Sequence, residues 1–83
     1  MDKMITVADI DCLRHTVGYG ARHAGYRNHF VPGGKDVASM HRLEAAGLVR
    51  RGLPYQDTFY FHATQEGCRV AGLGPTATRR ALG

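Results

Sequence analysis

The chain has 83 residues, which is enough for one domain but not for a second hydrophobic core. Its hydrophobic fraction of 43% excludes a disordered chain, and no run approaches the roughly 20 apolar residues that cross a membrane. The formal net charge of +4, carried mostly by arginine, favours an anionic partner such as nucleic acid or an acidic protein surface. An ordinary solvated basic surface is the alternative interpretation.

The first predicted element is a helix that Thr6 caps, because Asp9 follows in a capping-box position. Apolar residues then recur at helical spacing as far as Val17, and Gly18 and Gly20 end the helix. No hydrophobic segment follows the N-terminus, so we expect no signal peptide.

The segment 21–34 mixes charged and ring-bearing side chains. Within it, residues 26–31 have the composition of a short strand, and Pro32-Gly33-Gly34 closes that strand as a turn. A second helix is predicted over 36–46, with Asp36 as its N-cap.

Gly47 stands where a left-handed residue ends the second helix. Leu48 would then contact Leu43, which is the hydrophobic contact of a Schellman motif. A β-hairpin follows: residues 48–51 lead in, 52–57 turn, and 58–63 lead out with alternating apolar and polar side chains.

A short last helix is capped by Thr64 and stopped by Gly72, Gly74 and Pro75. Residues 76–83 are predicted to form a mobile basic tail that carries Arg79 and Arg80. The expected organisation is a single domain over 1–75 followed by this tail.

The order of these elements resembles a compact winged helix. Residues 43–51 contain "L-x-x-x-G-L-V", and Thr64 to Gly67 match a "T-x-x-G" motif, as at the end of the recognition helix and after the wing of winged-helix regulators. The resemblance implies an α+β, winged-helix-like domain. Only Pro32 to Lys35 is available where a full helix-turn-helix has another helix, so the domain lacks one helix and sequence-specific operator binding is in doubt.

The whole chain also resembles small proteins of bacteriophages and prophages. The shared patterns are "L-R-H" at 13–15, "Y-R-N-H-F-V" at 26–31, "A-G-L-V" at 46–49 and "F-H-x-T" at 61–64. This resemblance implies a mobile-element accessory protein in the cytoplasm of a bacterial host. Proteins of that kind include DNA-binding regulators and inhibitors of host defence such as anti-CRISPR proteins.

The run from Tyr19 to Phe30 is the strongest candidate for partner binding. Its arginine and histidine side chains suit phosphates, and its tyrosines suit stacking or anchoring. The alternative is that Tyr26 and Phe30 belong to the core and the arginines are simply solvated. The candidate contacts in this run are Tyr19, Arg22, His23, Tyr26, Arg27 and His29.

Three further arginines are candidate contacts. Arg42 is expected to point outward from the second helix, away from its apolar stripe. Arg50 and Arg51 begin the hairpin, where a wing would meet a phosphate, but successive strand residues point to opposite faces. At most one of those two therefore joins a given contact.

Metal binding and catalysis are the weaker alternatives. Cys12 and His15 with His23 and His29 number enough for zinc, but their spacing matches no standard finger. Cys12 and His15 are one helical turn apart and are the nearest approach to a nucleophile and base, with nothing to orient the histidine. Cys12 and Cys68 form no CxxC, which indicates an intracellular, reduced protein.

We therefore expect a non-enzymatic protein without metal or cofactor. Its predicted role is to bind and inhibit a host protein or nucleoprotein complex, as an anti-CRISPR would. The alternative is a small winged-helix regulator that binds DNA, and neither role involves a membrane.

Overall fold

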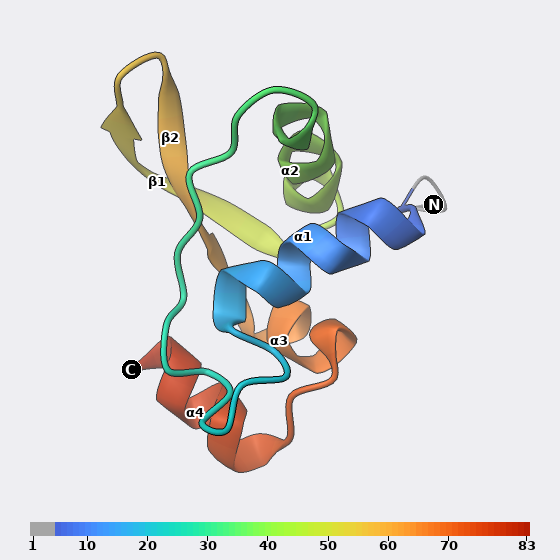
Figure 1. The fold of residues 1–83 in the computed structure, drawn as a ribbon, viewed down its shortest axis with the longest axis vertical. Coiled ribbons are helices and arrows are strands. Elements are labelled where there is room, and N and C mark those ends of the chain that lie inside the picture. Colours follow the sequence, from blue (N-terminus) through green and yellow to red (C-terminus); the bar gives the residue numbers. More distant parts are fainter. Residues whose placement is uncertain (1–4) are drawn as a thin grey trace.

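The computed structural model describes residues 5–83 and has an α+β fold (Figure 1). Helix α1 crosses the middle of the molecule, the β-hairpin extends from one end, and α4 lies at the other. Among the described residues, no helix is both long and apolar enough to cross a membrane. In chain order the elements are α1 (Val7–Val17), α2 (Asp36–Ala45), β1 (Val49–Tyr55), β2 (Thr58–Ala63), α3 (Gln65–Ala71) and α4 (Pro75–Leu82).

Helix α1 begins with the predicted capping box. The Thr6 hydroxyl accepts a hydrogen bond from the Asp9 amide at 3.1 Å, and the Asp9 carboxylate accepts one from the Thr6 amide at 3.1 Å. Both bonds satisfy amides that a helix start leaves without partners. Gly18, in the left-handed region, ends the helix as predicted.

Helix α2 ends in the predicted Schellman motif. The Leu48 amide donates to the Leu43 carbonyl at 2.9 Å, and the Gly47 amide donates to the Glu44 carbonyl at 3.0 Å. Gly47 has a φ of 79°, and both leucines are buried in the core. At the other end, Lys35 is the N-cap and Asp36 is already helical, one residue from the expected boundary.

The hairpin is confirmed, with β2 at its predicted bounds, but β1 is longer than predicted. β1 continues through most of the expected turn, and only Gln56 and Asp57 connect it to β2. The register shifts between Arg51 and Pro54, so Gly52 and Leu53 have no cross-strand partner. This bulge lets the strand pass through a glycine and a proline that would weaken a regular ladder.

The strand predicted over 26–31 is reduced to a single bridge. Phe30 exchanges backbone hydrogen bonds with Phe61 at 3.0 and 2.9 Å. Its neighbours bond elsewhere: the His29 amide donates to the Thr16 carbonyl, and the Asn28 carbonyl accepts from the His62 ring. The chain therefore crosses the edge of β2 without following it.

Residues 76–83 are predicted to form a mobile tail, but residues 75–82 form helix α4 instead. Pro75 occupies the first turn, where its missing amide hydrogen costs nothing. Ala77 and Ala81 pack against the core, and the Ala81 carbonyl accepts a hydrogen bond from the Asn28 side chain at 3.3 Å. Two alanines four residues apart supply too little apolar area to be recognised as a packed face from sequence.

One core holds the elements together. α1, α2, the hairpin and α3 all contribute to it, and α3 begins and ends at the predicted caps, Thr64 and Gly72. Its buried residues are Leu13, Val17, Met40, Leu43, Leu48, Val49, Phe61, Ala63, Cys68, Ala71 and Leu73.

A buried ion pair joins α1 to α2. The Asp9 side chain is fully buried, and its two oxygens accept hydrogen bonds from Nε and Nη2 of Arg42, each at 2.8 Å. The Arg42 guanidinium holds the pKa of Asp9 well below its ordinary value against the opposing effect of burial, and Ser39 and Thr6 lower it further. Asp9 thus caps its own helix and fixes the neighbouring one.

Replacing Gly47 by alanine should destabilise the fold by about 1 kcal/mol, because alanine is strained at positive φ. No atom lies within 4 Å of the new Cβ, so the cost is backbone strain alone. Urea unfolding measures it. Gly33→Ala is the matched control, since a Cβ there also meets nothing and φ is ordinary. Equal stability of the two variants would contradict the Schellman assignment.

Asp9→Asn should cost about 2 kcal/mol, less than the roughly 3–5 kcal/mol of a fully buried pair because 40% of the Arg42 side chain is exposed. The lowered pKa of Asp9 means that its contribution is present above the unfolded-state pKa of about 3.9 and is lost as pH falls below it. Unfolding measured from pH 7 to pH 2 should therefore show the gap between wild type and variant closing in acid. A difference in stability that does not change with pH would show that the carboxylate charge of Asp9 does not stabilise the fold.

Candidate binding surface

The charges are unevenly distributed along the chain. Residues 12–35 and 67–83 contain no Asp or Glu. Six of the acidic residues lie in the described remainder of the chain, at positions 9, 11, 36, 44, 57 and 66. The basic residues of the two acid-free segments are Arg14, Arg22, Arg27, Lys35, Arg69, Arg79 and Arg80.

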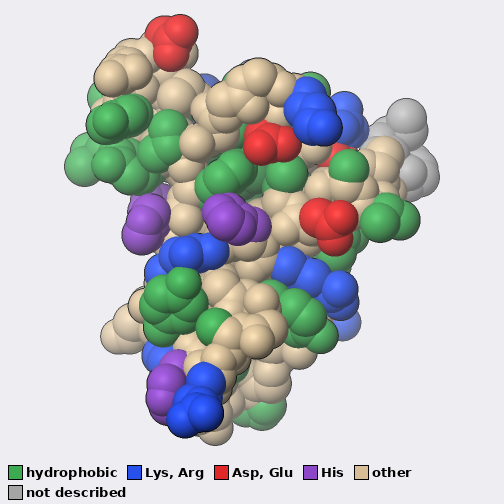
Figure 2. All heavy atoms as spheres, in the orientation of Figure 1, with side chains coloured by type: hydrophobic (Ala, Val, Ile, Leu, Met, Phe, Trp, Pro, Cys, Tyr) green, Lys and Arg blue, Asp and Glu red, His purple; other side chains and the backbone are tan. Residues whose placement is uncertain are grey.

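The fold packs these two segments against each other. Gly25 has a φ of 87° and lies so close to α4 that a Cβ would clash with the Ala77 carbonyl oxygen. Nη1 of Arg80 donates to the Ala24 carbonyl at 2.6 Å. We call the surface formed by this loop and α4 the basic pole (lower part of Figure 2) and define it by Arg22, His23, Arg27, Arg79 and Arg80.

Arg27 is held in place without losing its charge. Its Nε and Nη2 donate to the His15 carbonyl at 3.0 and 2.7 Å, and its Nη1 donates to the Tyr26 hydroxyl at 2.7 Å. The guanidinium also lies 5.2 Å from the centroid of the Tyr26 ring. Carbonyl and hydroxyl oxygens orient a cation but carry no formal charge, so Arg27 is positioned and still positive.

The other members of the pole are open to solvent. Arg22, His23 and Arg79 are exposed, and within residues 5–83 their side chains make no hydrogen bond or ion pair. Tyr26, beside Arg27, is 55% exposed, and its ring is not part of the core. Phe30 is half-buried and packs against the core, as the alternative interpretation expected.

Two of the arginines predicted to contact a partner are bound by carboxylates of this protein instead. Arg42 was expected to point outward, but Asp9 holds it at the α1–α2 junction. Arg51 makes two hydrogen bonds with Glu44, at 2.9 and 2.8 Å, and lies over the Phe59 ring at 4.7 Å. Both charges are compensated within the protein.

The hairpin carries a second exposed surface, of which the sequence analysis names only Arg50. Arg50 lies directly opposite His62 in the register, so their side chains share one face. The unpaired Leu53 in the bulge is 75% exposed, and Tyr55 is 44% exposed against the half-buried Tyr60. We call Arg50, Leu53, Tyr55, Tyr60 and His62 the hairpin face. The signal was Gly52-Leu53-Pro54, which was interpreted as turn rather than bulge.

Tyr19 and His29, both predicted to contact a partner, are not part of the basic pole. Tyr19 is 45% exposed, but the Arg14 guanidinium lies 4.3 Å from its ring centroid and covers one side. His29 is exposed and meets Tyr60 edge-to-face at 6.2 Å, so it adjoins the hairpin face.

The residues weighed as catalytic or metal-binding alternatives have other partners or lie apart. The Cys12 thiol donates to the Asp36 carboxylate at 3.5 Å rather than to His15, and burial together with Asp36 raises its pKa. A raised pKa disfavours the nucleophilic thiolate. Within the described part of the chain, no three His, Cys, Asp or Glu side chains come together to hold a metal ion.

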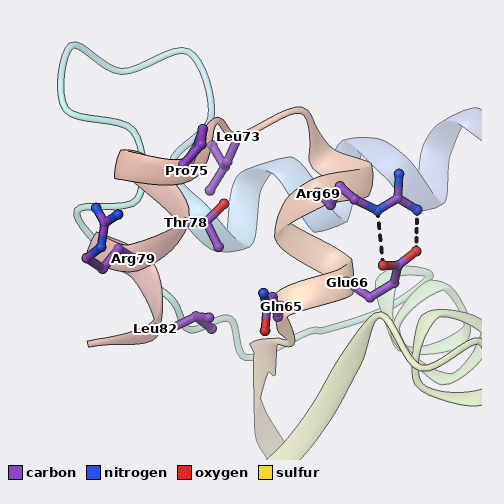
Figure 3. A pocket seen from close by; sticks show the side chains of 8 residues that line it. All are labelled: Gln65, Glu66, Arg69, Leu73, Pro75, Thr78, Arg79 and Leu82. Carbon is purple, nitrogen blue, oxygen red and sulfur yellow. Dashed lines mark hydrogen bonds and ion pairs between the residues drawn. The ribbon is translucent and has the colours of Figure 1, made fainter.

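An open groove of about 790 Å³ separates α3 from α4 (Figure 3). Leu73, Pro75 and Leu82 contribute apolar side chains to its lining, and the ion pair of Arg69 with Glu66 lies on its α3 side. That pair compensates its own charge, whereas Arg79, which also lines the groove, has no ion pair among the described residues, so the groove combines apolar contact with one free positive charge.

Comparison with known proteins finds no match: no family model, no curated protein and no solved structure is similar to this chain. The resemblances drawn from short sequence patterns therefore stay predictions.

The side chain of Asn28 fastens the loop of the basic pole to its neighbours. Its Oδ1 accepts from the Ala63 amide at 2.6 Å, and its Nδ2 donates to the carbonyls of Ala63 and Ala81 at 3.1 and 3.3 Å. Asn28→Ala should cost about 2 kcal/mol, since it leaves the Ala63 amide without a partner. His23→Ala, an exposed change in the same loop, should cost almost nothing in the same urea titration. Comparable losses would show that Asn28 does not fasten the loop.

Proposed function

We propose that this protein is a non-enzymatic accessory protein that docks on an anionic surface of a host protein or nucleoprotein complex and inhibits it, as an anti-CRISPR would. One observation carries the docking surface: the arginines of the basic pole face solvent on segments without a single acidic residue. The phage-type patterns noted above supply the biological setting. Uncompensated arginine charge attracts anions and contributes specificity when it is desolvated at an interface.

The surroundings of Cys12 bear on the non-enzymatic part of the proposal, because they disfavour a nucleophilic thiolate. The thiol nearest to a histidine in sequence is bound to Asp36 and held neutral. A reactive cysteine needs the opposite environment, one that stabilises the thiolate.

The second candidate, a DNA-binding regulator, is favoured by the element order. α1, the Phe30 bridge, α2, the hairpin and α3 follow one another as in a winged helix without its middle helix. However, the only arginine of α2 is Arg42, which Asp9 holds. A reading helix needs free side chains for base edges, so this arrangement weakens the regulator hypothesis.

The test is capture from bacterial lysate with the full-length protein, with and without nuclease. The variant Arg22→Gln with Arg79→Gln removes two pole charges that form no bond in the described structure, so folding should be unchanged. We expect capture of the specific partner to weaken on the order of tenfold, equivalent to about 1.4 kcal/mol.

The matched control is Lys35→Gln with Arg69→Gln, which removes the same charge outside the pole. Equal weakening by both double variants would show that only net charge matters and would overturn the proposed surface. Capture that survives nuclease identifies a protein target, whereas capture of duplex DNA alone would favour the regulator.

A further inference from the structure

The hairpin face combines aromatic and apolar side chains with the positive charge of Arg50. Arg50 and His62 are cross-strand neighbours, and Tyr55 meets Tyr60 edge-to-face at 5.5 Å. Leu53, pushed out by the bulge, is the second most exposed large apolar side chain among the described residues. Apolar side chains so exposed are usually explained by a partner when they cluster.

The hairpin face adjoins the loop of the basic pole. His29, Leu53, Tyr60 and His62 line one depression, and the His62 ring donates to the Asn28 carbonyl at 2.7 Å. Arg27 and Tyr26 come directly before Asn28 in the chain. Figure 2 shows hydrophobic, histidine and basic side chains following one another from the hairpin toward the opposite end of the molecule.

Acidic side chains are almost missing from the segments that build this surface. Residues 19–30 contain none, and in residues 49–63 the only one is Asp57, at the tip of the hairpin turn. The segments that build this surface therefore carry cations and rings, and Asp57 at the hairpin turn is their only carboxylate.

We propose that this surface is a track for single-stranded nucleic acid, with phosphates on the pole arginines and Arg50 and with bases against the rings of Tyr26 and Tyr55. The proposal rests on the proposed function and names the anionic component of the partner. Proteins that bind single strands combine a positive groove with aromatic rings on which bases stack.

A single strand fits this surface better than a duplex does. The exposed rings need the flat faces of bases, which a duplex hides inside its stack. A duplex would instead need a helix with free polar side chains for the major groove, and α2 has its arginine bound to Asp9.

The test is fluorescence anisotropy of the full-length protein with three labelled probes. They are an oligo(dT) of about 15 nucleotides, long enough for the roughly 4–16 nucleotides of known single-strand sites, a matching abasic phosphodiester, and a duplex of equal length. We expect the oligo(dT) to bind about tenfold more tightly than the other two, and to weaken steeply with salt.

Variants separate stacking from charge. Tyr55→Leu keeps an apolar side chain but removes the ring, so it should weaken binding of oligo(dT) several-fold and leave binding of the abasic probe unchanged. Tyr26→Leu should have the same effect. Arg22→Gln should weaken both probes. Tyr19→Leu is the control, because this ring packs against Arg14 and Gly72 and is not one of the rings assigned to the track, and it should change neither. Thermal unfolding of each variant shows whether it is folded.

Tighter binding to duplex, or equal binding to oligo(dT) and the abasic probe, would overturn the proposal. So would a loss caused by Tyr19→Leu but not by Tyr55→Leu or Tyr26→Leu. If no probe binds while lysate capture survives nuclease and still depends on Arg22 and Arg79, the track is wrong and the proposed function stands. If capture does not depend on the pole, the proposed function fails independently of the probes.

Discussion

The buried carboxylate of Asp9 is the constraint on which the rest of the structure depends. It accepts hydrogen bonds from its own helix start and from Nε and Nη2 of Arg42, so it ties α1 to α2. A buried charge of this kind is tolerated only when its partner is well aligned and its remaining lone pairs are used. Within residues 5–83, no buried side-chain nitrogen or oxygen is left without a partner, in keeping with that requirement.

The same ion pair decides where the protein presents positive charge. Arg42 is paired with Asp9, and Arg51 and Arg69 are paired with Glu44 and Glu66. The arginines of the basic pole are oriented by backbone carbonyls or left in solvent instead. A modest net charge thereby becomes one localised surface, and the proposed function and the track for single strands both draw on that localisation.

Local signals carried most of the secondary structure. The capping box at Thr6, the Schellman end at Gly47 and the cap at Thr64 depend on residues a few positions apart, and all three are present. Predictions failed where tertiary packing overrode the local conformational preference of the residues. Gly52-Leu53-Pro54 predicts a turn, but Gly52 and Leu53 form a bulge within β1 and Pro54 pairs with Phe59. Helix α4 forms where Ala77 and Ala81 pack against the core.

By itself the sequence determined the α+β class, the caps of α1 and α3, the Schellman end of α2 and the hairpin, and it named Arg22, His23, Tyr26 and Arg27 as candidates for binding. These features follow from short-range hydrogen bonding and from composition, which a single chain reveals. Only the tertiary structure decided that Arg42 is bound, that the loop and α4 share one surface, and that the hairpin presents a second one. The partners of those side chains lie far away in the chain, 33 residues in the case of Asp9 and Arg42 and 56 in that of Ala24 and Arg80. No periodicity or local motif encodes such pairs, because packing alone brings them together.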